Sequence, residues 1–310
     1  MESQGPMNSG RHGPPLSIFD CHTHIFAPSV VTNVSRKNGL TALLRLDVQG
    51  AVGRTDKAVL MREAKGAGIS GCLLLPTAPV NGVRKINGRF LEAVEGEDKL
   101  FTAGTLHPLA PGMDEELERL SLGGVRALKF SSFSQGFDLE EEKTLRLFEM
   151  IRTHNRSAGK EFFVILDTFC QADLYFGAPR EHVTTPEKLG RLASAFPEID
   201  FVGAHMGGLA APFHEIEEHL APRGNLYLDT SNASHVLARE DFLRLLALHG
   251  PGRILFGTDW PWFEHAAEVE RIRDLLDEAG FSLEDKARVF SGNIVRLLGL
   301  TGNWKLGIRD

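Results

Sequence analysis

Short apolar runs alternate with longer amphipathic stretches along the chain from residue 16 onward. This alternation is typical of successive strand and helix units that build a parallel sheet. Several runs are apolar at consecutive positions, as in residues 162–166, which suits strands that are covered on both faces. The runs predicted as strands are residues 16–24, 70–78, 101–108, 125–132, 161–169, 199–206, 225–231 and 253–260.

Capping signals indicate where some of the connecting helices begin. Thr185 precedes a proline, which is favoured in the first helical turn. Ser282 stands three residues before an acidic residue, as in a capping box, and Asp138 has the same spacing. We expect helices to start at these three residues, and we expect residues 282–299 to form a closing helix.

The order of the predicted elements favours one fold class. Strand and helix units in one continuous pattern favour an α/β fold, a closed (β/α)8 TIM barrel, with a doubly wound open sheet as the alternative. No dinucleotide-binding or phosphate-loop fingerprint follows the first predicted strand. We expect a single barrel domain over residues 16–310, preceded by a disordered tail over residues 1–15. The connections 26–53 and 170–183 are expected to set substrate specificity.

Composition narrows the class of partner. The 310 residues are 42% hydrophobic and 24% charged with a formal net charge of -7, as in an ordinary soluble globular protein. A mildly acidic chain has no general attraction for nucleic acid or an anionic membrane surface, so we expect neither as a partner. Cys21, Cys72 and Cys170 form no CxxC pair, which favours a reducing cytoplasm. We expect a small-molecule substrate and a homodimer.

Polar and ionisable side chains stand near the end of nearly every predicted strand. In a TIM barrel the carboxyl ends of the strands open onto one shared site. Burying several ionisable groups for packing alone is costly, so their joint placement indicates function. Asp229 among them suits either the orientation of His205 or a neighbouring strand, or a structural hydrogen bond. The residues are His22, His24, Thr77, His107, Lys129, Asp167, His205, Asp229 and Asp259.

The most informative motif is the His-Thr-His triplet of the first predicted strand. Residues i and i+2 of a strand share a face, so His22 and His24 are predicted to point into the barrel and Cys21 toward the helices. Two neighbouring imidazoles suit a divalent metal ion. Together with His205 after the sixth strand and Asp259 after the eighth, the triplet predicts a metal centre.

These motifs resemble those of the amidohydrolase superfamily, in particular the amidohydrolase 2 branch of metal-dependent TIM-barrel hydrolases and decarboxylases. The resemblance rests on FDCHTHIF, SQGFDL, GAHMGG, FGTDWPW and SGNIVRLLGL, in this order along the chain. It implies that His22, His24 and Asp259 are metal ligands. It also implies that His205 is a ligand or a catalytic residue.

Asp167 stands where the resemblance implies a histidine ligand, at the end of the fifth strand. As a fourth metal ligand, its hard carboxylate oxygen would shift the preference from zinc toward manganese or iron. Alternatively, Asp167 binds no metal and hydrogen-bonds a paired histidine or a substrate group. A metal-free site, as in related barrel lactonases, also stays open. We expect one divalent ion, zinc first, with manganese or iron as alternatives.

Three further residues are predicted to bind substrate. Lys129 suits a substrate carboxylate, with an interior ion pair or a carbamylated metal bridge as alternatives. His107, which precedes a proline, equally suits a structural turn. Arg180, in the loop after the fifth strand, suits an anionic substrate or is ordinary surface charge.

The predicted function is metal-dependent hydrolysis of a small lactone, amide or ester. The ion would polarise the carbonyl and lower the pKa of a bound water. Asp259 would take the proton of that water and pass it to the leaving group, and His205 would stabilise the oxyanion or act as base. The resemblance also admits a non-oxidative decarboxylase of an aromatic or unsaturated carboxylic acid. A metal-independent lactonase and a barrel that only binds a ligand are the remaining hypotheses.

Overall fold

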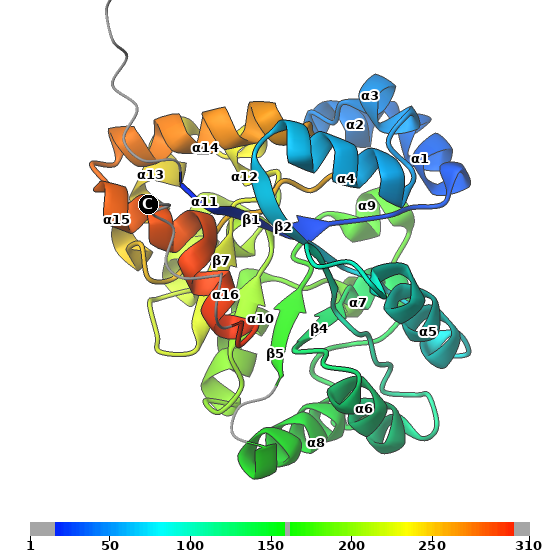
Figure 1. Ribbon diagram of the computed structural model, residues 1–310. Coiled ribbons are helices and arrows are strands. Elements are labelled where there is room, and N and C mark those ends of the chain that lie inside the picture. The colour runs from blue at the N-terminus through cyan, green and yellow to red at the C-terminus, as the bar shows by residue number, and fades with distance from the viewer. Residues whose placement is uncertain (1–15, 159–161, 301–310) are drawn as a thin grey trace, which may run out of the picture.

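The computed structural model describes residues 16–158 and 162–300 of the chain. Within these residues, eight parallel strands follow one another with helices between them (Figure 1). The tail predicted for residues 1–15 lies outside the described residues. Every run predicted as a strand contains or overlaps an observed one. The strands are β1 (Ile18–Thr23), β2 (Ile69–Leu74), β3 (Leu100–Thr102), β4 (Ala127–Phe130), β5 (Phe163–Leu166), β6 (Phe201–Gly203), β7 (Leu226–Asp229) and β8 (Ile254–Leu255).

Hydrogen bonds close the strands into a barrel. They join β1 to β3 in one group and β4 to β8 in another. One parallel bridge, between Gly104 and Leu128, connects the two groups. On the other side, the Asp259 N–H donates to the His22 carbonyl over 2.9 Å, and the His24 N–H donates to the Trp260 carbonyl over 2.7 Å. This ring is the predicted (β/α)8 TIM barrel.

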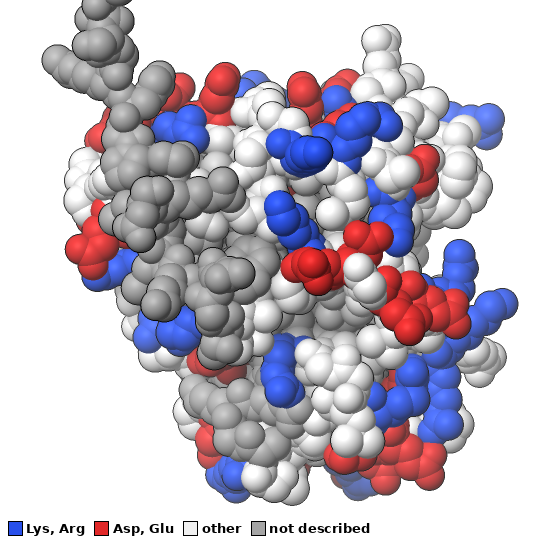
Figure 2. Space-filling view, in the orientation of Figure 1, with Lys and Arg blue, Asp and Glu red and all other residues white. Residues whose placement is uncertain are grey.

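Helices surround the barrel on its outer side (Figure 1). The longer ones are α4 (Lys57–Gly66), α5 (Val83–Val94), α6 (Met113–Leu122), α8 (Glu142–Ala158), α10 (Pro186–Ala195), α13 (Arg239–His249) and α14 (His265–Glu278). None of the helices in the described ranges is long and apolar enough to span a membrane. Figure 2 shows acidic and basic side chains intermixed over one face of the molecule, so this face presents no broad field of one sign.

Shorter helices fill the connections. The long segment after β1, predicted as residues 26–53, folds into α1 (Pro28–Ser35), α2 (Asn38–Leu44) and α3 (Val48–Val52). The predicted closing helix is divided into α15 (Leu283–Ala287), the π-helical η3 (Arg288–Gly292) and α16 (Asn293–Leu297). The remaining short helices are α7 (Ser132–Gln135), α9 (Ala172–Phe176), η1 (Arg180–His182), η2 (His205–Gly207), α11 (Phe213–His219) and α12 (Ala233–Val236).

Two of the three predicted helix starts are confirmed. The Thr185 side chain caps α10, and Ser282 forms a capping box with Asp285 at α15. The start predicted at Asp138 is wrong, because α8 begins at Glu142. The Asp138 carboxylate instead pairs with the Lys188 ammonium at 2.6 Å, a contact between distant segments that outweighs the local capping signal.

Apolar side chains fill the interior of the barrel, and α16 closes the end where the strands begin. Cys21 belongs to this interior cluster, so the prediction that it faces the helices is wrong. The pairing of β1 with β2 shifts by one residue between Asp20 and Thr23. Such a bulge interrupts the alternation of faces along a strand. The cluster comprises Phe19, Cys21, Leu73, Leu75, Ala103, Ala127, Phe163, Ile165, Val202, Tyr227, Leu255, Ile294, Val295 and Leu298.

Candidate metal centre and active site

The ends of β1 and β8 bring three potential metal ligands together. The Nε2 atoms of His22 and His24 lie 3.1 Å apart. The Asp259 Oδ1 atom lies 3.7 Å from the first and 3.6 Å from the second. All three residues are at most 9% exposed. The predicted grouping of His22, His24 and Asp259 is therefore present in the structure.

Each of the two imidazoles uses its Nδ1 in a hydrogen bond, which directs its Nε2 toward the other ring. His22 Nδ1 lies 2.9 Å from the Asp229 carboxylate, and His24 Nδ1 lies 3.0 Å from the Leu75 carbonyl. Because both partners are acceptors, each Nδ1 carries the ring proton. Burial, and then the neighbouring His22, lower the pKa of His24 well below its usual value, which favours the neutral ring.

The two Nε2 atoms thus face each other at 3.1 Å, close enough for both to bind one ion. Two imidazole nitrogens and one carboxylate oxygen form a donor set that suits a divalent transition-metal ion. The residues present in the chain fit the predicted ion.

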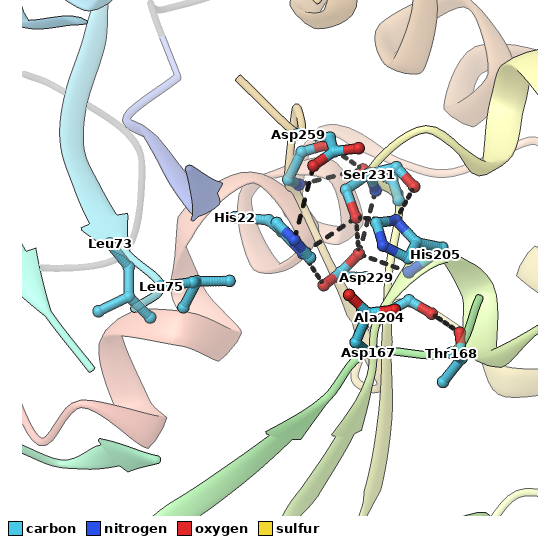
Figure 3. A network of polar contacts seen from close by, with 12 residues as sticks. His22, Leu73, Leu75, Asp167, Thr168, Ala204, His205, Asp229, Ser231 and Asp259 are labelled. Carbon is cyan, nitrogen blue, oxygen red and sulfur yellow. Dashed lines mark hydrogen bonds and ion pairs between the residues drawn. The ribbon is translucent and has the colours of Figure 1, made fainter. Parts of the chain in front are cut away.

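Asp229, the last residue of β7, joins two histidines (Figure 3). Its Oδ2 accepts from His22, and its Oδ1 accepts from the His205 N–H at 2.9 Å and from the Ser231 N–H and hydroxyl. Burial raises the pKa of Asp229, but His22 and these donors outweigh burial and hold it far below its usual value. Carboxylates bonded to a ligating imidazole orient the ring and increase its basicity.

His205 begins the short helix η2 after β6 and lies beside His22, with ring centroids 4.8 Å apart. Its Nδ1 lies 2.9 Å from the Ser231 carbonyl. Burial, and then His22, lower the pKa of His205 to about 4, so the ring is neutral at neutral pH. Because Nδ1 donates to the carbonyl, Nε2 is the atom left to exchange a proton.

Strained backbone marks the same end of the barrel. His205 has a φ of 55° and Asp259 a φ of 63°, both in the left-handed region that favours glycine. Asn232, which follows Ser231, has a φ of 55°. Each such residue costs on the order of 1 kcal/mol or more, and such strain clusters at functional sites.

Lys129 and Asp167 lie on neighbouring strands of the same interior. The Lys129 side chain is fully buried, and its Nζ has no hydrogen-bond partner among the described residues. Its ion pair with the Asp167 carboxylate is long, at 4.0 Å. Burial raises the pKa of Asp167, but the Lys129 ammonium, His205 and the Phe169 N–H together outweigh burial and keep the pKa below its usual value. Lys129 is thus a buried cation with an incomplete set of partners.

The structure does not bring Asp167 into the group of potential ligands. Among the described residues, the sets whose donor atoms lie within 4.8 Å of one another are His22 with His24 and Asp259, and His22 with His205 and Asp229. A ligand role for Asp167 stays a prediction. Burial, and then Asp167, raise the pKa of Asp259 well above its usual value.

Two predicted substrate-binding residues have other partners. His107 is buried, its Nε2 donates to the Gln135 carbonyl over 2.9 Å, and its Nδ1 accepts from the Leu109 N–H over 3.2 Å. Both ring nitrogens are used, so the geometry supports the structural alternative for His107. Arg180 is 75% exposed and pairs with Asp173 at 2.9 Å, which is ordinary surface charge.

Ser231 is the site residue that sequence reasoning missed. It lies two residues after Asp229, and its hydroxyl contacts His22 Nδ1 at 3.1 Å and His205 Nδ1 at 2.8 Å. In the sequence it is the last residue of the run predicted as a strand, 225–231, a position where serines without a function also occur.

Solved structures share this barrel at low sequence identity. A 5-carboxyvanillate decarboxylase from Sphingomonas paucimobilis is 19% identical, with a TM-score of 0.67 over 92% of this chain and 100% of its own. A putative 2-pyrone-4,6-dicarboxylic acid hydrolase from Pseudomonas putida is 19% identical, with a TM-score of 0.60 over 94% of this chain and 99% of its own. At this identity the likeness shows the fold.

Metal ions occur in similar structures. An amidohydrolase from Burkholderia multivorans with bound zinc is 12% identical, with a TM-score of 0.67 over 92% of this chain and 100% of its own. A decarboxylase from Novosphingobium aromaticivorans, 14% identical with a TM-score of 0.63 over 93% of this chain and 97% of its own, has bound manganese. No curated protein matches the chain. The sequence model of the amidohydrolase 2 family, described as amidohydrolase, matches residues 19–300, and the chain belongs to this family.

Proposed function

We propose that the protein is a metal-dependent hydrolase of a small lactone, amide or ester. The observation that carries this proposal is the convergence of His22, His24 and Asp259, with the two histidine Nε2 atoms facing each other at 3.1 Å. A divalent ion held by these residues would supply a Lewis acid and lower the pKa of a water. Zinc is the first choice for this donor set, with manganese or iron as alternatives.

The proton transfers are assigned to Asp259 and His205. The Asp259 Oδ1 atom lies 3.6–3.7 Å from the Nε2 atoms of His22 and His24, so its carboxylate is placed to take a proton from a water beside them and return it to the leaving group. His205 keeps its Nδ1 proton on the Ser231 carbonyl, which leaves Nε2 to act as a base or to hold a proton near the oxyanion. Asp229 holds the His22 ring in the tautomer that ligation requires.

Lys129 is proposed to bind an acidic group of the substrate. Its ammonium is buried, has no hydrogen-bond partner among the described residues, and lies 4.0 Å from its nearest carboxylate, Asp167. A substrate carboxylate would complete its set of partners. We therefore expect the substrate to be a small organic acid.

A decarboxylase of an aromatic or unsaturated acid is the second candidate. The buried Lys129 favours any reaction of a carboxylic acid, and the structural likeness to a 5-carboxyvanillate decarboxylase, with a TM-score of 0.67, is higher than the 0.60 of the putative pyrone hydrolase. In this reaction, the same residues would hold the substrate. An acidic residue would donate a proton to the carbon atom that loses carbon dioxide.

Metal analysis and product analysis test both candidates. The purified protein should contain about one divalent ion per chain, and His22→Ala should lose the ion and activity together, by more than about 100-fold, because residues behind a ligand already account for 10–100-fold. A panel of lactones and hydroxybenzoates separates ring opening from carbon dioxide release. If protein treated with a chelator and the His22→Ala variant both turn over a lactone at the full rate, metal dependence is overturned and a metal-independent lactonase is favoured.

A further inference from the structure

A second charged cluster lies at the end of the barrel where the strands begin, opposite the candidate metal centre. It lines a cavity of about 430 Å³ between the starts of β6, β7 and β8 and the helix α16 (red in Figure 1). Its lining includes four charged side chains and the tyrosine that two of them contact: Asp200, Arg253, Arg288, Arg296 and Tyr227.

Tyr227 brings two arginines together. Its side chain is 1% exposed, and its hydroxyl accepts hydrogen bonds from Arg253 and from Arg296, the latter over 2.6 Å. Both guanidinium groups also lie over the phenol ring, 4.7 Å and 5.5 Å from its centroid. Two cations bonded to one oxygen are held close together, although like charges repel.

The two arginines have no carboxylate partner in residues 16–158 and 162–300. Their hydrogen bonds to side chains there go to the neutral phenol. Arg288 differs, because it pairs with Glu284 at 2.5 Å. The lining thus carries three guanidinium groups against one carboxylate, Asp200. Two guanidinium groups held beside each other without a carboxylate partner repel each other.

We propose that this cavity binds a small oxyanion, a phosphate group. Arginine presents five N–H donors in a planar fork that matches phosphate oxygens, and Arg253 and Arg296 each use only one on Tyr227. A phosphate dianion would balance the two unpaired charges. The site is separate from the candidate metal centre, because it lies where β7 begins, whereas Asp229 ends that strand.

Calorimetric titration of the full-length protein with inorganic phosphate, in a buffer without phosphate, tests the site. A parallel titration with phenyl phosphate distinguishes a free ion from a phosphorylated metabolite, and tighter binding of either one supports the site. Arg253→Gln and Arg296→Gln should each weaken binding by about tenfold or more, since hydrogen bonds between charged groups are the strongest class. Arg244→Gln, on an exposed arginine paired with Glu217, should leave binding unchanged.

His22→Ala distinguishes this cavity from an ion at the opposite end, which would also attract phosphate. Retained phosphate binding in His22→Ala, with loss in Arg296→Gln, supports the proposal. Loss in His22→Ala with no change in Arg296→Gln overturns it, as does the absence of any heat at millimolar phosphate. Arg296 is exposed, so its variant should fold even where Arg253→Gln does not.

Discussion

The two ends of the barrel use their interior positions in opposite ways. Where the strands begin, apolar side chains of α16, such as Ile294, pack against the interior cluster. Where the strands end, buried positions hold ionisable groups, and His205 and Asp259 adopt left-handed backbone. Apolar packing at the first end lowers the free energy of the folded state. The ionisable groups at the second end lack partners that a bound ligand would supply. The difference predicts which substitutions change stability and which change chemistry.

The largest effect on stability is expected at α16. Ile294→Ala removes a fully buried side chain from the closed end of the barrel. It should reduce the free energy of unfolding by about 2–5 kcal/mol, as large-to-small substitutions in cores do. Denaturant unfolding measures the loss, and turnover well below the melting temperature should stay near that of the unchanged protein. A large fall in turnover with intact stability would contradict this division between the ends.

At the other end, Asp229→Asn should mainly affect chemistry. The amide keeps the shape of the side chain but removes the charge that orients His22 and accepts from Ser231. Metal affinity or activity should fall by about 10–100-fold, which is typical of groups behind a metal ligand. Metal titration followed by assay checks this. Unchanged metal affinity together with unchanged turnover would leave Asp229 a purely structural residue.

Lys129→Met is expected to have the smallest of the three effects, and the effect should be on substrate binding. Methionine fills a similar volume and removes a buried charge that has no hydrogen-bond partner among the described residues. The KM for a carboxylate substrate should rise by about tenfold, since a hydrogen bond to a charged group contributes roughly 1.5 kcal/mol or more. Neutral substrate analogues are the control, because their KM should not change. A fall in thermal stability instead would assign Lys129 to the fold.

Sequence reasoning found the fold from local periodicity, and it found the core of the site from the strand ends together with the family resemblance. The apolar runs mark strands wherever they occur, and the strand ends of a barrel necessarily meet, which placed His22, His24 and Asp259 together. These inferences need no knowledge of which side chains touch. The family match over residues 19–300 agrees with the resemblance seen in the motifs.

The errors arose where the answer depends on a distant partner. Cys21 turns inward because β1 has a bulge that only its pairing with β2 reveals. Asp138 pairs with Lys188, which is 50 residues away in the chain, and does not cap a helix. For His107 the sequence left two alternatives open, and the contact with the Gln135 carbonyl of the next connection, which supports the structural one, is also distant in sequence. The loops predicted to set substrate specificity, such as residues 26–53, carry no motif from which a substrate could be inferred.

The junction between β8 and β1 links metal binding to the integrity of the ring. The backbone bonds of this junction run between the residues that supply the ligands, from Asp259 to His22 and from His24 to Trp260. An ion held by these side chains would connect the last strand of the barrel to the first through its ligands. The ion would thus slow any opening of the barrel at this junction, in addition to its role in chemistry.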